Sequence, residues 1–167
     1  KKKNNKNKIL MFLFKTLSLI FFTILIYSII IIKSLNSELK DALVYILLIS
    51  ILTDIGGLVI GSTFKGKKLT KISPKKTVSG AFGSIFFSLM LVPFYLDIFK
   101  DYKISILVLI TLAVSLTSQI GDIFISYLKR KAKVKDTSNL LPGHGGVLDR
   151  IDGMIFAIPV GLLIFSI

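Results

Sequence analysis

The chain has 167 residues, of which 53% are hydrophobic, and its mean hydropathy is +0.78. These values exclude a soluble globular domain and indicate an integral membrane protein. A formal net charge of +13 can indicate a nucleic-acid partner, but in a membrane chain the cations set the topology, so we expect no nucleic acid. The absence of cysteine excludes disulfides and thiolate chemistry, which leaves carboxylates, cations and one histidine.

The apolar runs predict an all-α, polytopic membrane bundle with about five transmembrane helices. Residues 1–8 form a lysine-rich tail, typical of an anchor on the membrane surface, and residues 9–167 form one membrane-embedded domain. The predicted spans are residues 9–32, 42–60, 80–99, 104–128 and 153–167. We expect Pro93 to kink the third span. The fifth has 15 residues, or about 22 Å, which is short for a full crossing.

The second span carries an acid, Asp54, followed by Gly56, Gly57 and Gly61. An ionised carboxylate is costly in hydrocarbon, so such a residue usually faces a polar cavity or a partner. One interpretation is close helix packing through the glycines, with the aspartate hydrogen-bonded to a neighbour. The other is the wall of an active site, where the glycines let a substrate or a helix approach the acid.

The fourth span ends in a polar stripe. Ser126 follows Asp122 by four residues, and Lys129 and Arg130 follow Ser126 by three and four, so on a continuous helix the four residues share one face. A polar stripe on an otherwise apolar helix predicts that this face lines a site.

A long polar passage, residues 126–152, follows between two apolar runs. It combines cations, carboxylates and glycines: Lys129, Arg130, Lys135, Asp136, His144, Gly145, Gly146, Asp149, Arg150 and Asp152. Successive glycines let backbone N–H groups face an anion, and lysine and arginine neutralise phosphate. Carboxylates suit magnesium, whose other ligands are water and substrate phosphates. The alternative is a solvated basic loop that joins two membrane helices.

The order of residues in this passage resembles the signature of the phosphatidate cytidylyltransferases, also called CDP-diacylglycerol synthases. It reads Ser-x-Leu-Lys-Arg, four residues, Lys-Asp-x-Ser, two residues, and Leu-Pro-x-His-Gly-Gly-Val-x-Asp-Arg-Ile-Asp. A second element, Ser-Pro-Lys-Lys-Thr at residues 73–77, is similar to the Ser-Pro-x-Lys-Thr of that family. This chain departs from the family at Val78, where an aromatic is common, and at Ile125, where a glutamate is common.

The resemblance covers most of the chain from Asp54 onward and implies the C-terminal catalytic portion of a longer enzyme. A phosphate oxygen of phosphatidic acid would attack the α-phosphorus of CTP, giving CDP-diacylglycerol and pyrophosphate. The resemblance also implies a magnesium requirement and a homodimer.

The resemblance and the residue chemistry together give each candidate a role. The expected catalytic residues are Asp122, Lys129, Arg130, Lys135, His144, Asp149 and Arg150. The expected substrate-binding residues are Ser73, Lys76, Thr77, Ser126, Gly145 and Gly146, and the expected magnesium ligands are Asp122, Asp149, Asp152 and Asp54. We favour a phosphate contact or a positioning role for His144 over a general base, because a phosphate nucleophile is already deprotonated at neutral pH.

The distribution of cations predicts the orientation in the membrane. Residues 1–8, 64–76 and 129–152 hold 17 of the 22 lysines and arginines. The positive-inside rule therefore predicts a cytoplasmic N-terminus, with both motif segments on the cytoplasmic side of a bacterial inner membrane. That side is where CTP is available.

Three alternatives remain open. A CTP-dependent kinase of polyprenol or phytol would share the nucleotide, but the long signature argues against it. A small ion or proton transporter could use Asp54 and Asp122 as a relay, but it would leave the Gly-His-Gly-Gly segment unexplained. A non-catalytic scaffold is the third alternative.

Replacing Asp149 with asparagine tests the expected ligand set. The variant should lose turnover of CTP but still fold in detergent, because only the ionised oxygen of a metal ligand is removed. Product formation and size-exclusion chromatography measure the two properties, and retained activity would remove Asp149 from the ligand set.

Overall fold

A computed structural model of the chain describes residues 37–70, 76–134 and 151–166, together with Thr23, Ile26, Ile30 and Ser73. Within these residues every regular element is a helix: α2 (Ser37–Phe64), α3 (Val78–Leu89), α4 (Val92–Tyr95), α5 (Ile104–Lys131) and α7 (Met154–Phe165). One isolated antiparallel bridge joins Lys68 to Thr77. The prediction of an all-α fold is confirmed for the described part of the chain.

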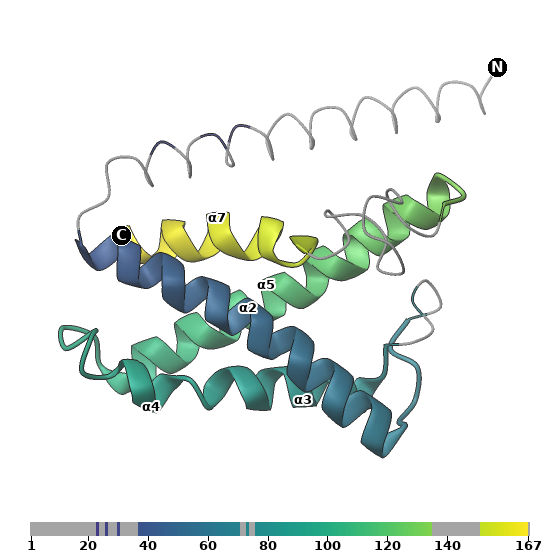
Figure 1. The fold of residues 1–167 in the computed structure, drawn as a ribbon, viewed down its shortest axis with the longest axis horizontal. Helices are drawn as coiled ribbons and strands as arrows, with labels where there is room; N and C mark the ends of the chain where they lie inside the picture. The colour runs from purple at the N-terminus through teal and green to yellow at the C-terminus, as the bar shows by residue number, and fades with distance from the viewer. Residues whose placement is uncertain are drawn as a thin grey trace, which may run out of the picture.

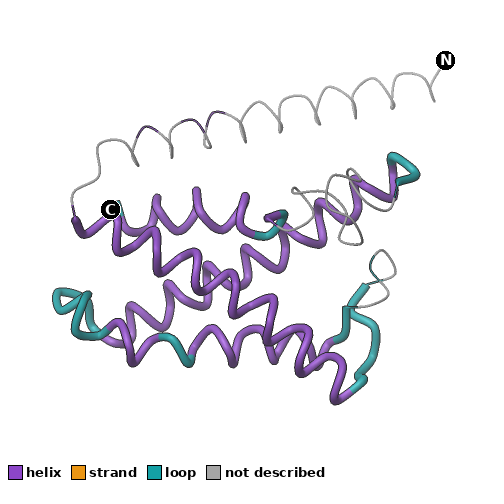
Figure 2. Tube along the Cα trace, in the orientation of Figure 1, coloured by secondary structure: helices purple, strands orange, loops and turns teal. Residues whose placement is uncertain are grey.

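The helices form a bundle in which successive long segments run in opposite directions (Figure 1). α2 and α5 run toward one end of the bundle, and α3 and α7 return from it. The tube in Figure 2 shows that the connection between α2 and α3 lies at this end, as do the end of α5 and the start of α7. We call it the loop end; the described flanks of both motif segments therefore lie together.

Among the described residues, three helical stretches are long and apolar enough to cross a membrane, judged by length and composition: Glu38–Phe64, Val78–Tyr95 and Ile104–Lys131. They coincide with the second, third and fourth predicted spans, and the crossing of a membrane by each stays a prediction. α2 extends beyond the predicted residues 42–60 at both ends, because polar residues continue its helix into the flanking segments. The total of five spans and the side of the N-terminus stay predictions, and residues 9–32 fall outside the described residues except for Thr23, Ile26 and Ile30.

The predicted fifth span, residues 153–167, corresponds to the shorter helix α7. α7 has 12 residues, or about 18 Å, which is less than the hydrocarbon thickness of about 30 Å. α7 begins just after a turn that contains Asp152. This polar turn, and not α7 itself, therefore lies at the loop end of the bundle.

Pro93 interrupts the helix of the third span, where the sequence predicts a kink. α3 ends at Leu89, and Pro93 lies in the first turn of α4. The proline ring has no N–H and would clash with the carbonyl four residues earlier, which belongs to Leu89. The helix therefore stops at that carbonyl and starts again with the proline in a position that tolerates it.

The core lies where α2, α5 and α7 cross. Its fully buried side chains are Tyr45, Ile46, Ile49, Leu107, Val114, Ala157 and Leu162. Two hydroxyl pairs join α2 to α5: the Tyr45 hydroxyl and Thr111 Oγ1 are 2.6 Å apart, and Thr53 Oγ1 donates to Ser115 Oγ at 2.9 Å. Hydrogen bonds of this kind hold helices together where the surroundings are as apolar as the core.

Glycines bring α2 and α3 into close contact. A Cβ on Gly80 would lie 2.8 Å from the carbonyl oxygen of Gly57, and one on Gly83 would lie 2.7 Å from that of Gly56. Only residues without a side chain allow two helices to approach so closely. The packing interpretation of the glycines is therefore confirmed for this pair of helices.

Substituting Gly83 with alanine should lower the melting temperature of the protein in detergent. The added methyl would overlap Ile60 and the backbone of α2. Overpacking of about 2 kcal/mol should exceed the roughly 1 kcal/mol that alanine gains in helix propensity. Val59→Leu adds a similar volume on an exposed face of α2 and serves as the control. An unchanged melting temperature for Gly83→Ala would contradict the packing.

Candidate active site

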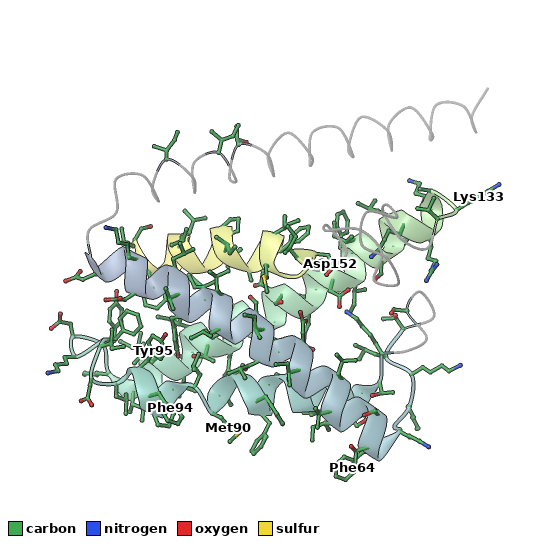
Figure 3. All side chains as sticks on the ribbon, viewed as in Figure 1. Phe64, Met90, Phe94, Tyr95, Lys133 and Asp152 are labelled. Carbon is green, nitrogen blue, oxygen red and sulfur yellow. The ribbon has the colours of Figure 1, made fainter. Side chains whose placement is uncertain are left out.

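A pocket of about 440 Å³ opens at the loop end, between α2, α3 and α5. The predicted site residues that line it come from four different segments: Asp54, Ser73, Lys76, Thr77, Asp122, Lys129 and Asp152. Figure 3 labels Asp152 beside α5, while Tyr95 lies at the opposite end of the bundle. Residues that are up to 98 positions apart, Asp54 and Asp152, thus share one cavity.

An ion pair between Lys76 and Asp122 crosses the pocket from the α2–α3 connection to α5. Ser126 Oγ, one turn further along α5, donates a hydrogen bond to Asp122 Oδ1 at 3.4 Å. The backbone holds the lysine in place, because Leu69 N–H donates to the carbonyl of Lys76 at 2.8 Å. Lys76 and Asp122 are each partly buried, so their charges are only partly screened by water.

Thr77, which we expect to contact substrate, also has a structural role that the sequence did not predict. It is the N-cap of α3, and its Oγ1 accepts a hydrogen bond from Gly80 N–H at 3.0 Å. The side chain thereby satisfies one of the free N–H groups in the first turn of the helix. Thr77 also lines the pocket, so the start of α3 and the pocket wall depend on the same residue.

The second ion pair joins Lys129 to Asp152, with 3.4 Å between Lys129 Nζ and Asp152 Oδ2. The N–H of Gly153 donates to Asp152 Oδ1 at 3.0 Å. Burial, followed by the negative charge of Asp122, raises the pKa of Asp152 to about 6, although Lys129 and the Gly153 N–H oppose this rise. The carboxylates at this end therefore repel one another, and a cation from solution would relieve the repulsion.

The polar stripe predicted at the end of the fourth span forms only in part. α5 continues to Lys131, so all four residues lie on one helix. Asp122 and Lys129 line the pocket, and Ser126 contacts it through Asp122. Arg130 is exposed and outside the pocket lining, and its guanidinium lies 3.5 Å from the carbonyl of Val134, to which it donates. Arg130 follows Lys129 by one residue, which places its side chain about 100° further around the helix axis.

Several predicted site residues lie outside the described part of the chain. They are Lys135, Asp136, His144, Gly145, Gly146, Asp149 and Arg150. Their roles therefore stay predictions. The described residues next to this segment follow the end of α5 and precede the start of α7, and both of these helix ends lie at the loop end of the bundle.

The chemistry of the pocket fits a magnesium ion held with a phosphate. Asp54 lies within electrostatic range of Asp122, Asp152 and Lys76, so three carboxylates face two lysines around one cavity. Within the described residues, no three acidic or histidine side chains are close enough to hold a metal by themselves. Magnesium needs only one or two carboxylates when substrate phosphates and water complete its shell.

Sequence reasoning gave no role to Gln119, which lines the same pocket. Its Nε2 is buried and has no hydrogen-bond partner among the described residues. The sequence could have indicated this position, because Gln119 precedes Asp122 by three residues and both side chains therefore lie on one face of α5.

Over the described residues, the fold and the pocket define a helical membrane protein with a site lined by aspartates and lysines at one end of its bundle. Residues 1–167 match the profile of the Cytidylyltransferase family, and the chain belongs to this family. The resemblance seen in the signature is thereby confirmed.

Several curated relatives share the same functional name. A phosphatidate cytidylyltransferase of Staphylococcus epidermidis is 41% identical over 128 residues, which is 75% of this chain and 49% of the relative. The enzyme of the same name from Staphylococcus aureus gives the same values, and that of Rickettsia bellii is 42% identical over 115 residues, or 64% of this chain and 50% of the relative. The chain spans about half the length of the curated relatives it matches. The comparisons give no support to the lipid-kinase and transporter alternatives.

A double-mutant cycle on Lys76→Met and Asp122→Asn should reveal the ion pair. We expect a coupling energy of about 1 kcal/mol in thermal unfolding, because the pair is partly buried. Lys68→Met removes an exposed lysine from the same connection, and its combination with Asp122→Asn should be additive. Additivity of the Lys76 and Asp122 variants would show that the pair does not form.

Proposed function

We propose that this chain provides the catalytic portion of a phosphatidate cytidylyltransferase, which transfers a cytidylyl group from CTP to phosphatidic acid. The products are CDP-diacylglycerol and pyrophosphate. The observation that carries the proposal is the pocket, in which lysines and aspartates meet at the loop end of a membrane bundle. Family membership and the names of the curated relatives support the same reaction.

The depth of the pocket suits one substrate from water and one from the bilayer. Asp54 lies ten residues, or about 15 Å, before the end of α2, and Asp122 lies nine residues, or about 14 Å, before the end of α5. Both acids are thus within the bundle but near the loop end. A nucleotide can approach from the connections there, and a lipid headgroup can approach from the side.

The reaction brings two anions together, so the protein has to neutralise and align phosphates. Lys76 and Lys129 each start from an aspartate partner and can turn to a phosphate oxygen when a substrate enters. Asp122 and Asp152, released from their lysine partners, would then be able to bind magnesium through their carboxylate oxygens. A bound magnesium ion would supply charge neutralisation to the phosphates. Exchange of partners alone does not change the net charge of the pocket, so the charge of the incoming phosphates has to be offset by such a cation.

The proposed roles of the individual residues follow from this exchange. Asp122 and Asp152 would hold magnesium together with Asp149, and Asp54 would support them. Lys76 and Lys129 bind phosphate together with Lys135 and Arg150, and Ser73 stands beside them in the pocket. His144, Gly145 and Gly146 contact phosphate from the segment of the chain between α5 and α7. Arg130 reaches the nucleotide from the rim, outside the pocket lining.

The setting of the site completes the proposal. Residues 9–167 act as a single membrane-embedded catalytic domain, with the N-terminus and the loop end on the cytoplasmic side of a bacterial inner membrane. The cation distribution supports this orientation, because the loop end carries the lysine-rich connections. The active form is a homodimer.

Turnover with CTP labelled at either the α- or the γ-phosphate tests the reaction. The chain is purified in detergent and mixed with phosphatidic acid and magnesium. We expect α-label in the lipid, γ-label in pyrophosphate, and loss of both with EDTA. Asp122→Asn should reduce the rate at least a hundredfold, because a metal ligand and the partner of Lys76 are lost together.

Asp97→Asn provides the matched control, because it removes a carboxylate next to α4, at the end of the bundle opposite the pocket. Its rate should equal that of the unmodified chain. Transfer of γ-label to lipid would indicate a kinase instead, and the absence of any labelled lipid from a folded sample would refute cytidylyl transfer by this chain.

A further inference from the structure

Four lysines at the loop end lie outside the pocket and form a second basic surface. Their side chains are exposed, and none of them has an ion pair with a described carboxylate: Lys65, Lys67, Lys68 and Lys133. We call them the outer lysines. The two pocket lysines differ, because Lys76 and Lys129 each have an aspartate partner.

The two ends of the bundle carry different distributions of charge. The end opposite the pocket mixes both signs, with Glu38, Lys40 and Asp41 in α2 and with Lys100, Asp101 and Lys103 before α5. The described carboxylates nearest the loop end are Asp54, Asp122 and Asp152, and all three line the pocket. The outer lysines are therefore not interspersed with described acids, and such a surface attracts anions.

A turn at the end of α5 keeps Lys133 close to the helix. Lys133 has a left-handed backbone conformation, with φ 58°. Its N–H donates to the carbonyl of Arg130, and the N–H of Val134 donates to that of Lys129, both at 3.0 Å. This pair of bonds reverses the chain directly after a helix. Figure 3 shows Lys133 beyond the end of α5, on the outer side of the bundle.

The connection after α2 is held against the start of α3 in a similar way. Lys65, with φ 41°, directly follows α2 and turns the chain. The N–H of Val78 then donates to the carbonyl of Lys67 at 2.9 Å, and Lys68 forms a backbone bridge with Thr77. These contacts hold the three lysines of the connection at the end of the bundle.

Exposed aromatic residues place the outer lysines at the level of lipid headgroups. Phe64 is the last residue of α2 and is 69% exposed, and Tyr127 lies about one turn before the end of α5 and is 37% exposed. Aromatic side chains at the ends of membrane helices prefer the boundary between hydrocarbon and water. Lys65 is the next residue after Phe64, so the cations begin where the lipid phosphates lie.

We propose that the outer lysines bind the phosphates of anionic lipids in the leaflet around the loop end. Clusters of lysines that immediately follow membrane helices attract anionic lipids. A bilayer surface fits better than one free phosphate ion, because the lysines do not converge. They follow two different helices, whose ends lie well apart at Phe64 and Lys133 in Figure 3.

This lipid-binding surface is separate from the pocket, since none of the outer lysines lines the cavity. Its binding of lipid therefore requires neither nucleotide nor turnover. One consequence rests on the proposed function: phosphatidic acid is itself anionic, so the outer lysines would raise its concentration beside the pocket. The binding of anionic lipids does not rest on that function.

The test measures which lipids surround the chain in a membrane. The full chain is reconstituted in phosphatidylcholine with a trace of spin-labelled phosphatidylglycerol or spin-labelled phosphatidylcholine, without CTP or magnesium. Electron spin resonance gives the fraction of each probe that the protein immobilises. At low salt, phosphatidylglycerol should associate about threefold more strongly. The preference should disappear in about 1 M salt, where the screening length is about 3 Å.

The combined variant Lys65→Gln, Lys67→Gln and Lys68→Gln should lose most of this preference, because it removes three of the four cations. The matched control combines Lys40→Gln, Lys100→Gln and Lys103→Gln. It removes the same charge from exposed positions at the opposite end of the bundle and should keep the preference. Size-exclusion chromatography checks that both variants fold.

Four results would overturn the inference. They are equal association of the two probes with the unmodified chain at low salt, a preference that high salt leaves unchanged, a preference that survives in the loop-end variant, and an equal loss in the control variant. Inorganic phosphate added at constant ionic strength should have no effect, and a loss of preference there would indicate a site for free phosphate instead. Failure of cytidylyl transfer would leave each of these results unchanged.

Discussion

The close crossing of α2 and α3 is the contact on which the pocket depends. Because the backbone of Gly57 occupies the space where Gly80 would carry a Cβ, the start of α3 lies directly against α2. The N-cap Thr77 is fixed there, and Lys76, one residue earlier, is brought to Asp122 on α5. Any side chain at this crossing would move the α3 wall away from Asp54. The packing of α2 against α3 thus also assembles this wall of the pocket.

The second constraint comes from α7. A Cβ on Gly153 would lie 2.5 Å from Ser118 Oγ, so the turn before α7 sits tightly on α5. This turn holds Asp152 against Lys129 inside the bundle, where burial raises the pKa of the carboxyl. Because α7 is short, a carboxylate lies at the loop end. A longer span would have placed apolar residues there. The repulsion that results is what a cationic ligand would relieve.

The pocket combines two kinds of polar group that answer different needs. Its lysine–aspartate pairs hold charges that stay balanced without substrate and can be exchanged for phosphate. Gln119 adds a neutral amide side chain to the lining deeper in the bundle, where a charge would be costly. The polar side chains of α5 in the pocket thus change from charged near the loop end to neutral further in.

The sequence by itself determined the helices, because apolar runs, Pro93 and the polar end of the fourth span are local features of the chain. It also determined the family, because many fixed positions stand in one segment. Only the tertiary structure decided that Lys76 pairs with Asp122, that Thr77 caps α3, and that Gln119 enters the pocket while Arg130 does not. Helical periodicity gives the residues that share a face, but it does not say which neighbouring helix that face meets, since this depends on contacts between segments far apart in the chain.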